Sequence, residues 1–340
     1  MDRIRSVLLG IAGLALVAAS AQASTHEFFK EKTVRIIVGF SPGGGFDIYS
    51  RTIARHLGKH IPGNPTIVVE NMTGAASLIA ANHVYKIAKA DGLAIGNFNG
   101  GVLLGQVLEW RGIEFDAQKF EYIGVPARNE NVCAFTKKSG ITSLEKWQTA
   151  KTPVKLGGAG PGTTTDDVPK ILKPALGLPI HLVSGYKGTA VIRLAAEAGE
   201  VAGMCLSWDS LKAMWGRAIE LGDVVVVLQT MPRPRPDLPA VPLAINYAKT
   251  EEARQLVRAG IHDRAAIIFL YALPPGTPKD RVQILRAAFM DTMRDAEFLA
   301  EAEKSRLDVD PVSGDEVERI VRGFFQLSPG IVGKLREVLK

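Results

Sequence analysis

Three glycine-rich stretches of this sequence could place backbone N–H groups where an anion binds. The first is PGGGFD, residues 42–47, which directly follows the apolar run 34–38. Consecutive glycines can adopt positive φ and let a ligand approach the main chain, and we expect Gly44 to need such a conformation. A helix that begins here with Asp47 as its N-cap would point unpaired N–H groups at the anion.

Two later stretches repeat the order of strand, glycines, hydroxyls and helix start: GAGPGTTTDD at 158–167 and SGYKGT at 184–189. We expect a ligand carboxylate to be held mainly by amides of the 42–47 and 162–165 stretches, with assistance from threonine hydroxyls. The candidate ligand-binding residues are Phe40, Pro42, Gly43, Gly44, Gly45, Phe46, Asp47, Asn97, Gly162, Thr163, Thr164, Thr165, Tyr186, Gly188, Thr189, Trp208 and Asp209.

The elements that must position these residues alternate along the chain. Short apolar runs rich in β-branched residues are followed by segments with helical spacing, which predicts an α/β fold with ligand-binding loops at the carboxyl ends of parallel strands. The expected strands are 34–38, 66–69, 93–96, 122–125, 131–136, 154–157, 201–206, 224–228 and 265–272, and the expected helices are 77–90, 143–149, 191–198, 279–294, 297–306, 315–325 and 330–339.

Composition narrows the function classes. The chain has 340 residues, of which 46% are hydrophobic and 22% charged, so it is typical of a globular protein of roughly two domains. Its formal net charge of +6 favours acidic small molecules as ligands. Lysine and arginine are dispersed and no basic run is interleaved with aromatic residues, which argues against nucleic acid.

The first residues predict export. Arg3 and Arg5 precede an apolar run at 7–19, and Ala21-Gln22-Ala23 has the small-x-small form of a cleavage site. We therefore expect a signal peptide over residues 1–23 and a periplasmic protein. The alternative, a membrane anchor, is disfavoured because this run is shorter than the ~20 residues that span a bilayer.

Enzymatic sites are not indicated. The six histidines all lie outside the glycine stretches, and no Ser/His/Asp or Cys/His arrangement has supporting context, so we expect no catalytic residue, metal or cofactor. His56 and His60 could bind a metal as an i, i+4 pair, but their neighbours predict an exposed helix end. Cys133 and Cys205 are expected to be buried free thiols, with a disulfide as the alternative in an oxidising compartment.

Several motifs together resemble the periplasmic receptors of tripartite tricarboxylate transporters, also called Bug receptors. The resemblance covers nearly the whole chain after the signal peptide. It is carried by PGGGFD at 42–47, VENMTGA at 69–75, DGLAI at 91–95, YKG at 186–188 and ALPPGTP at 272–278. One departure is Asp166, which stands where this family often has histidine.

This resemblance implies a two-lobed periplasmic binding protein fold of type II, with two parallel or mixed sheets, flanking helices and a hinged interlobe cleft. Lobe 1 would comprise 26–128 and 233–340, and lobe 2 would comprise 129–232. It also implies a monomer that presents a small carboxylate to membrane permease subunits. Two alternatives remain open, namely a receptor that reports the same ligand to a sensor kinase, and an exported hydrolase.

Overall fold

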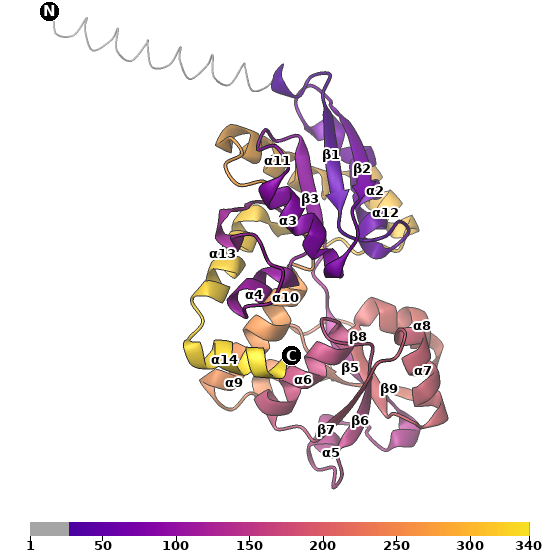
Figure 1. Cartoon of the computed structure of the whole chain (residues 1–340). Helices are drawn as coiled ribbons and strands as arrows, with labels where there is room; N and C mark the ends of the chain where they lie inside the picture. Colours follow the sequence, from indigo (N-terminus) through magenta and orange to yellow (C-terminus); the bar gives the residue numbers. More distant parts are fainter. Residues whose placement is uncertain (1–26, 340) are drawn as a thin grey trace, which may run out of the picture. The chain divides into compact units, whose positions relative to one another are not determined.

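The computed structural model describes residues 27–339, so the expected signal peptide lies outside the described residues. Contacts divide these residues into two units (Figure 1). Unit 1 comprises 27–99, 112–127 and 269–318, and unit 2 comprises 100–111, 128–268 and 319–339. Between residues 27 and 339, no helix is long and apolar enough to cross a membrane.

The chain returns to unit 1 at residue 269, whereas the resemblance implied a return at 233, within the proline-rich stretch 231–236. That stretch is tied to unit 2, because Gln229 Nε2 donates to Val241 O at 2.6 Å and to Leu238 O at 3.1 Å. The N–H of Arg235 also donates to Gln229 Oε1 at 2.9 Å. One buried glutamine therefore folds the proline-rich segment back onto its own unit.

Unit 1 is built on a six-stranded mixed sheet with the order β11-β4-β10-β3-β1-β2. Strands β1, β2 and β3 are parallel, whereas β10 is antiparallel to β3 and β4, and β11 is antiparallel to β4. Its strands are β1 (Thr33–Val38), β2 (Thr66–Asn71), β3 (Ala94–Asn99), β4 (Glu121–Val125), β10 (Phe269–Leu273) and β11 (Val312–Ser313). Its α-helices are α2 (Gly45–Leu57), α3 (Leu78–Lys86), α11 (Lys279–Thr292) and α12 (Ala296–Lys304). It also contains the short 3₁₀ helices η1 (Gly58–His60), η2 (Ala75–Ser77) and η3 (Ala117–Lys119).

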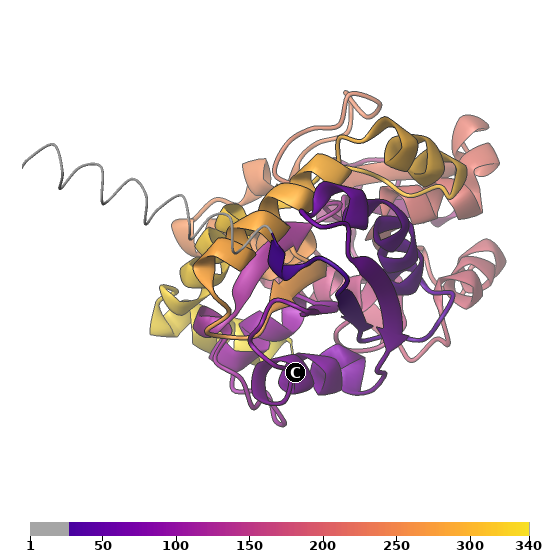
Figure 2. The ribbon, with the colours of Figure 1, turned by 90° about the horizontal axis from the view of Figure 1, so that it is seen from above.

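Strand β1 is covered on both faces, as its apolar run predicts. Val34, Ile36 and Val38 are buried in a cluster with side chains of α2 and α11. Figure 2 shows the ribbons of these elements from above. Ile37 points to the other face, where α3 packs, and is 1% exposed. Arg35 on this same face is exposed and pairs with Glu70, so the strand is buried on both faces only over Ile36–Val38, where three apolar residues are consecutive.

Unit 2 is built on a five-stranded sheet with the order β7-β6-β8-β5-β9. Strand β6 is parallel to β7 and β8, and β5 is antiparallel to β8 and β9. Its strands are β5 (Asn131–Thr136), β6 (Val154–Gly158), β7 (Ile180–Ser184), β8 (Gly203–Ser207) and β9 (Val224–Gln229). Its α-helices are α4 (Gly101–Val107), α5 (Leu144–Gln148), α6 (Thr164–Leu176), α7 (Thr189–Ala198), α8 (Trp208–Glu220), α9 (Glu251–Val257), α10 (Asp263–Ala266) and α14 (Pro329–Val338). It also contains the short 3₁₀ helices η4 (Lys137–Ser139) and η5 (Ala244–Tyr247) and the π-helix η6 (Arg258–His262). Helix α13 (Gly314–Phe325) begins in unit 1 and ends in unit 2.

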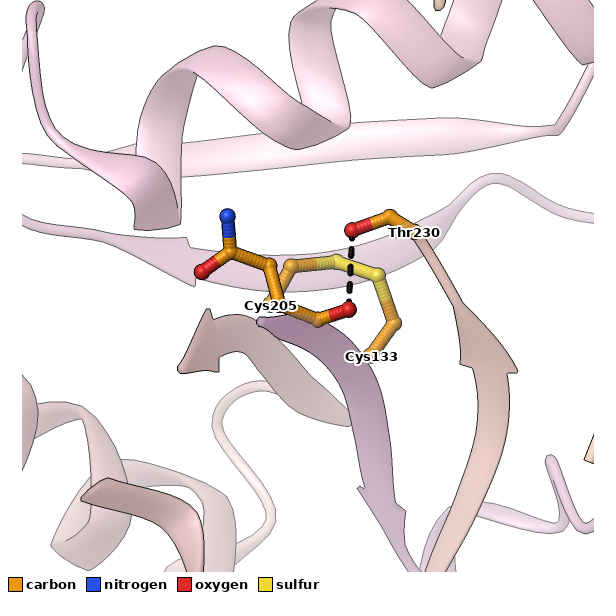
Figure 3. Close-up of a disulfide and its surroundings, with 4 residues drawn as sticks. Cys133, Cys205 and Thr230 are labelled. Atoms are coloured by element: carbon orange, nitrogen blue, oxygen red, sulfur yellow. Dashed lines mark hydrogen bonds between the residues drawn. A yellow bond between two sulfur atoms is a disulfide. The ribbon is translucent and has the colours of Figure 1, made fainter. Parts of the chain in front are cut away.

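The expectation of free thiols is wrong, because Cys133 and Cys205 form a disulfide (Figure 3). The two residues are direct partners in the antiparallel pairing of β5 with β8, and their Cα atoms lie 4.0 Å apart. Beside them, the Thr230 hydroxyl donates to the main-chain oxygen of Asn131 at 3.0 Å. The bond depends on the pairing of two strands whose cysteines are 72 residues apart in sequence, and no pattern within either strand shows which strand is its partner.

Candidate functional site

The first glycine stretch lies at the carboxyl edge of the unit 1 sheet, between β1 and α2. The end of β3 lies beside it, since Val38 pairs with Asn97, and Phe269 at the start of β10 pairs with Asn99. Residues 39–47, together with Phe269, therefore meet at one edge of the sheet; we call this group the first corner. Polar and glycine loops at such an edge are the usual place for a ligand in an open α/β sheet.

Helix α2 begins differently from the expectation. Its N-cap is Gly44, in extended conformation with φ −84°, and the glycine with positive φ is Gly43, at +81°. Asp47 lies within the first turn of the helix, where its carboxylate accepts a hydrogen bond from Gly43 N at 2.8 Å. Asp47 therefore caps the turn from inside the helix by reaching back, as the acidic residue of a capping box does.

Asp47 is the centre of a hydrogen-bonded network that fixes the first corner. Arg51 Nε donates to Asp47 Oδ2 at 2.9 Å, and Asn71 Nδ2 donates to Asp47 Oδ1 at 2.9 Å. Asn71 also donates to Phe40 O at 2.9 Å, which ties the end of β2 to the loop. Burial alone would raise the pKa of Asp47, but the hydrogen bonds from Arg51, Gly43 and Asn71 outweigh it and lower this pKa to about 2.

We expect the Asp47→Asn variant to lose about 2 kcal/mol of unfolding free energy at neutral pH. Because the pKa of Asp47 is lowered in the folded state, its full contribution to stability is present above its ordinary pKa of 3.8 and is lost as the pH falls toward about 2. Urea titrations at several pH values should show the two proteins converging in acid. Glu70→Gln, which removes an exposed pair with Arg35, is the matched control and should stay within about 0.5 kcal/mol of wild type at every pH.

The start of α2 keeps N–H groups that the helix itself does not use. The first intrahelical bond runs from Ile48 N to Gly44 O at 2.9 Å, so the N–H groups of Gly45, Phe46 and Asp47 have no intrahelical partner. Gly45 is exposed. Because Arg51 balances the charge of Asp47, these donors are available to an external anion at the positive end of the helix dipole.

An aromatic group borders these donors. The rings of Phe40 and Phe46 stack with centroids 4.1 Å apart, and Phe46 contacts Phe269 at 4.7 Å, which in turn contacts Tyr49 at 4.7 Å. Phe40 and Phe46 are half-buried. The first corner therefore combines anion-binding amides with an apolar surface, which suits the carboxylate and the hydrocarbon part of one organic acid.

The candidate residues of unit 2 also gather at one sheet edge. Strands β6, β7 and β8 are parallel, so their carboxyl ends lie at the same edge and lead into the starts of α6, α7 and α8. Gly162–Thr165, Tyr186–Thr189 and Trp208–Asp209 follow these three strands; we call this group the second corner. The sequence-based expectation that the loops of unit 2 meet at one edge is consistent with this topology.

The second corner is already occupied by carboxylates of the chain itself. Asp166 is 0% exposed and accepts hydrogen bonds from Gly160 N at 2.7 Å and from the Ser184 hydroxyl at 2.6 Å. Asp167 accepts from Gly162 N at 3.1 Å and from Arg264 Nη2 at 2.8 Å. The amide of Gly162, expected to hold a ligand carboxylate, thus has an internal anionic partner.

Neutral donors remain at the second corner. In α6 the first long intrahelical bond runs from Asp167 N to Thr163 O, which leaves the N–H groups of Thr164 and Thr165 without an intrahelical partner. In α7 the first long intrahelical bond runs from Ile192 N to Gly188 O, so the N–H group of Thr189 also has no intrahelical partner. These groups can bind a polar atom, but a carboxylate bound there would lie close to the buried Asp166 and Asp167.

Besides Asp47, four further candidate side chains illustrate partners within their own unit. Asn97 is 0% exposed and donates to Leu270 O, and Trp208 is 5% exposed and donates from Nε1 to Asp237 at 2.8 Å. The Thr165 hydroxyl accepts from Ala159 N at 3.0 Å. The Tyr186 hydroxyl donates to Glu200, and burial together with this carboxylate raises the pKa of Tyr186 to about 12. These internal hydrogen bonds hold the four side chains in place and stabilise the two corners.

Sequence reasoning missed four residues that shape the corners. Phe269 starts β10 and adds an aromatic ring to the first corner from more than 200 positions away, which no local pattern reveals. Asn71 and Arg51 hold Asp47, and the sequence did carry a signal for them: both fall in or beside the stretches of the family resemblance. Arg264, the partner of Asp167, had no such signal.

Comparison with known proteins gives a family match over most of the chain. The model of the tripartite tricarboxylate transporter family receptor matches residues 50–332. A UPF0065 protein from Bordetella pertussis is 28% identical over 204 residues, which is 58% of this chain and 60% of that protein. A UPF0065 protein from the tcbD-tcbE intergenic region of Pseudomonas sp. is 35% identical over 91 residues, 27% of this chain and 26% of that protein. The matches thus span less than two thirds of either relative.

Solved structures share the fold. A TctC solute-binding protein from Polaromonas has a TM-score of 0.71 at 16% identity and covers 90% of this chain and 98% of its own. Rpa4515 of Rhodopseudomonas palustris, solved with adipate, has a TM-score of 0.62 at 22% identity over 89% and 97%. MatC of the same organism, solved with malate, has a TM-score of 0.59 at 19% identity over 91% and 99%. The two mixed sheets with flanking helices are therefore those of two-lobed periplasmic binding proteins, as expected from the sequence.

Proposed function

The chain belongs to the tripartite tricarboxylate transporter family of receptors, and from this premise we propose that it is a periplasmic solute-binding protein for a small organic carboxylate. The proposal includes delivery of the ligand by a monomeric receptor to the membrane permease subunits of such a transporter. It includes no catalytic conversion of the ligand, because the family and the fold are those of receptors. Two neighbours of the same fold that were solved with malate and with adipate support the ligand class.

The observation that carries the proposal is the start of α2. Its first N–H groups lack intrahelical partners, and Asp47, the nearest acidic group, is neutralised by Arg51. A carboxylate placed there would accept charge-assisted hydrogen bonds from Gly45 and Phe46, each of which contributes roughly 1.5–3 kcal/mol. Two such bonds would supply a large part of the ~8 kcal/mol that a micromolar dissociation constant represents.

We assign the ligand's carboxylate to the first corner and not to the second. The second corner holds two buried carboxylates, Asp166 and Asp167, and one of them is paired with Arg264. Thr164 and Thr189 can offer N–H and hydroxyl groups to an uncharged polar group. The stacked rings of Phe40 and Phe46 can cover its hydrocarbon part.

A thermal-shift panel tests this proposal with three matched compounds: hexanoate, its dicarboxylate analogue adipate, and the uncharged hexanamide. A ligand that binds only the folded state raises the melting temperature by mass action. We expect at least one of the two carboxylates to raise it in a saturable manner and hexanamide to have no effect.

Two results would count against the proposal. One is that hexanamide stabilises the protein as well as its carboxylate, which would show that no anion is recognised. The other is chemical conversion: after prolonged incubation with stoichiometric protein, chromatography should return the bound carboxylate unchanged, and a new product would indicate an enzyme.

A further inference from the structure

A second group of chemically able side chains lies at the other end of α2 from the first corner. It consists of His56 and His60, from the end of α2 and the following turn, and of Asp295, Glu297 and Glu301, from the start and body of α12. We call this group the α2–α12 cluster. All five residues belong to unit 1.

The histidines face α12 and not solvent, contrary to the expectation of an exposed helix end. The side chains of His56 and His60 are 12% and 22% exposed. His56 Nε2 lies 2.7 Å from Glu301 Oε2, and His60 Nε2 lies 2.9 Å from Asp295 Oδ2. Residues four apart share one face of a helix, so both imidazoles reach the same neighbour.

The possible ligand atoms converge tightly. One atom each from His56, Asp295 and Glu297 lie within 4.8 Å of one another, and His60 Nε2 adjoins the same Asp295 carboxylate. Asp295 is itself fixed, since its Oδ1 accepts the N–H groups of Glu297 and Phe298 at 2.9 and 3.2 Å as the N-cap of α12. A ligand held in place in this way loses little freedom when a metal binds.

A cation already pairs with two carboxylates of this group. Lys59 Nζ lies 2.8 Å from Asp295 Oδ2 and 2.6 Å from Glu297 Oε2, and Arg55 pairs with Glu301. The ammonium of Lys59 is a flexible point charge on a long stem, and its side chain is 38% exposed. It can swing into solvent and leave both carboxylates to another cation.

We propose that the α2–α12 cluster binds a divalent transition-metal cation such as Zn²⁺ in competition with Lys59. His56, Asp295 and Glu297 are its ligands, with His60 beside Asp295 as the fourth. Imidazole nitrogens combined with carboxylate oxygens suit Zn²⁺ better than Ca²⁺ or Mg²⁺, which prefer oxygen ligands alone. The ion would join α2, which carries the first corner at its other end, to α12.

The test is calorimetric titration of ZnCl₂ into full-length mature protein that carries no histidine tag and has been stripped with EDTA and dialysed. We expect one saturable site in the wild type. The His56→Asn/His60→Asn variant should bind Zn²⁺ at least about tenfold more weakly. The control variant His83→Asn, which changes a histidine on α3, should bind like the wild type.

The Lys59→Met variant is expected to change the affinity for Zn²⁺ in the direction opposite to the double histidine variant. Because it removes the competing ammonium without removing a metal ligand, Zn²⁺ should bind more tightly than in the wild type, whereas a simple ion-pair network predicts no gain. Circular dichroism confirms that each variant is folded.

Three results would overturn the proposal: no saturable Zn²⁺ binding up to millimolar concentration, equal binding by wild type and the double histidine variant, or no gain in Lys59→Met. These outcomes do not depend on carboxylate binding.

Discussion

Gly45→Pro is expected to weaken carboxylate binding by roughly 10- to 100-fold, because it removes one charge-assisted N–H donor. Gly45 is the first residue of α2, a position where proline fits because its missing N–H is not used by the helix. The preceding Gly44 is in extended conformation, which is what a residue before proline requires. Calorimetry with the carboxylate that stabilises the wild type most strongly measures the change.

The matched control is Gly45→Ala, which keeps the N–H and adds the same Cβ. That Cβ would lie 3.7 Å from the Phe269 ring, an ordinary contact, so folding should be unaffected. We expect the alanine variant to bind within about threefold of wild type, since it loses no hydrogen bond. If both variants bind alike, the amide of Gly45 is not a ligand donor.

Removing the disulfide is expected to have the largest effect on stability. The bond closes a loop of 72 residues, for which loss of unfolded-state entropy corresponds to roughly 4 kcal/mol. Both cysteines are 0% exposed, in the centre of the unit 2 sheet. We therefore expect Cys133→Ala/Cys205→Ala to unfold at a clearly lower urea concentration than the oxidised wild type.

A reductant provides the control for this experiment. Added during the titration, it should bring the wild type close to the double variant and leave the variant unchanged. Equal stability of the variant and the oxidised wild type, or two thiols titrating in the denatured wild type without reductant, would contradict the disulfide.

The fold could be predicted from local patterns to a large extent. The run at 34–38 is β1 within one residue, the run at 131–136 is β5, and α5 begins after Ser143, whose hydroxyl accepts the N–H of Lys146. These elements have their signals within a few residues of sequence: continuous apolar runs, glycines and capping side chains. Helix α8 was missed, because its start at Trp208–Asp209 reads as the end of the preceding strand.

Features that depend on distant partners could not be predicted. The disulfide needs the pairing of β5 with β8, and the proline-rich segment stays with unit 2, where Gln229 donates to Val241 O. At the first corner the glycines were located correctly, but the positive φ belongs to Gly43, and Asp47 acts from inside the helix. The partners that decide these details, Asn71 and Phe269, come from other strands of the sheet.

The most direct test of carboxylate binding at the first corner is an amide ¹H–¹⁵N NMR titration of ¹⁵N-labelled protein with the best carboxylate of the panel. Hydrogen bonding to a carboxylate moves an amide proton downfield. We expect the largest downfield shifts at Gly45 and Phe46, and no comparable downfield shift at Gly162, whose N–H already donates to Asp167. Saturable binding that leaves Gly45 and Phe46 unshifted, with downfield shifts confined to the second corner, would contradict the account.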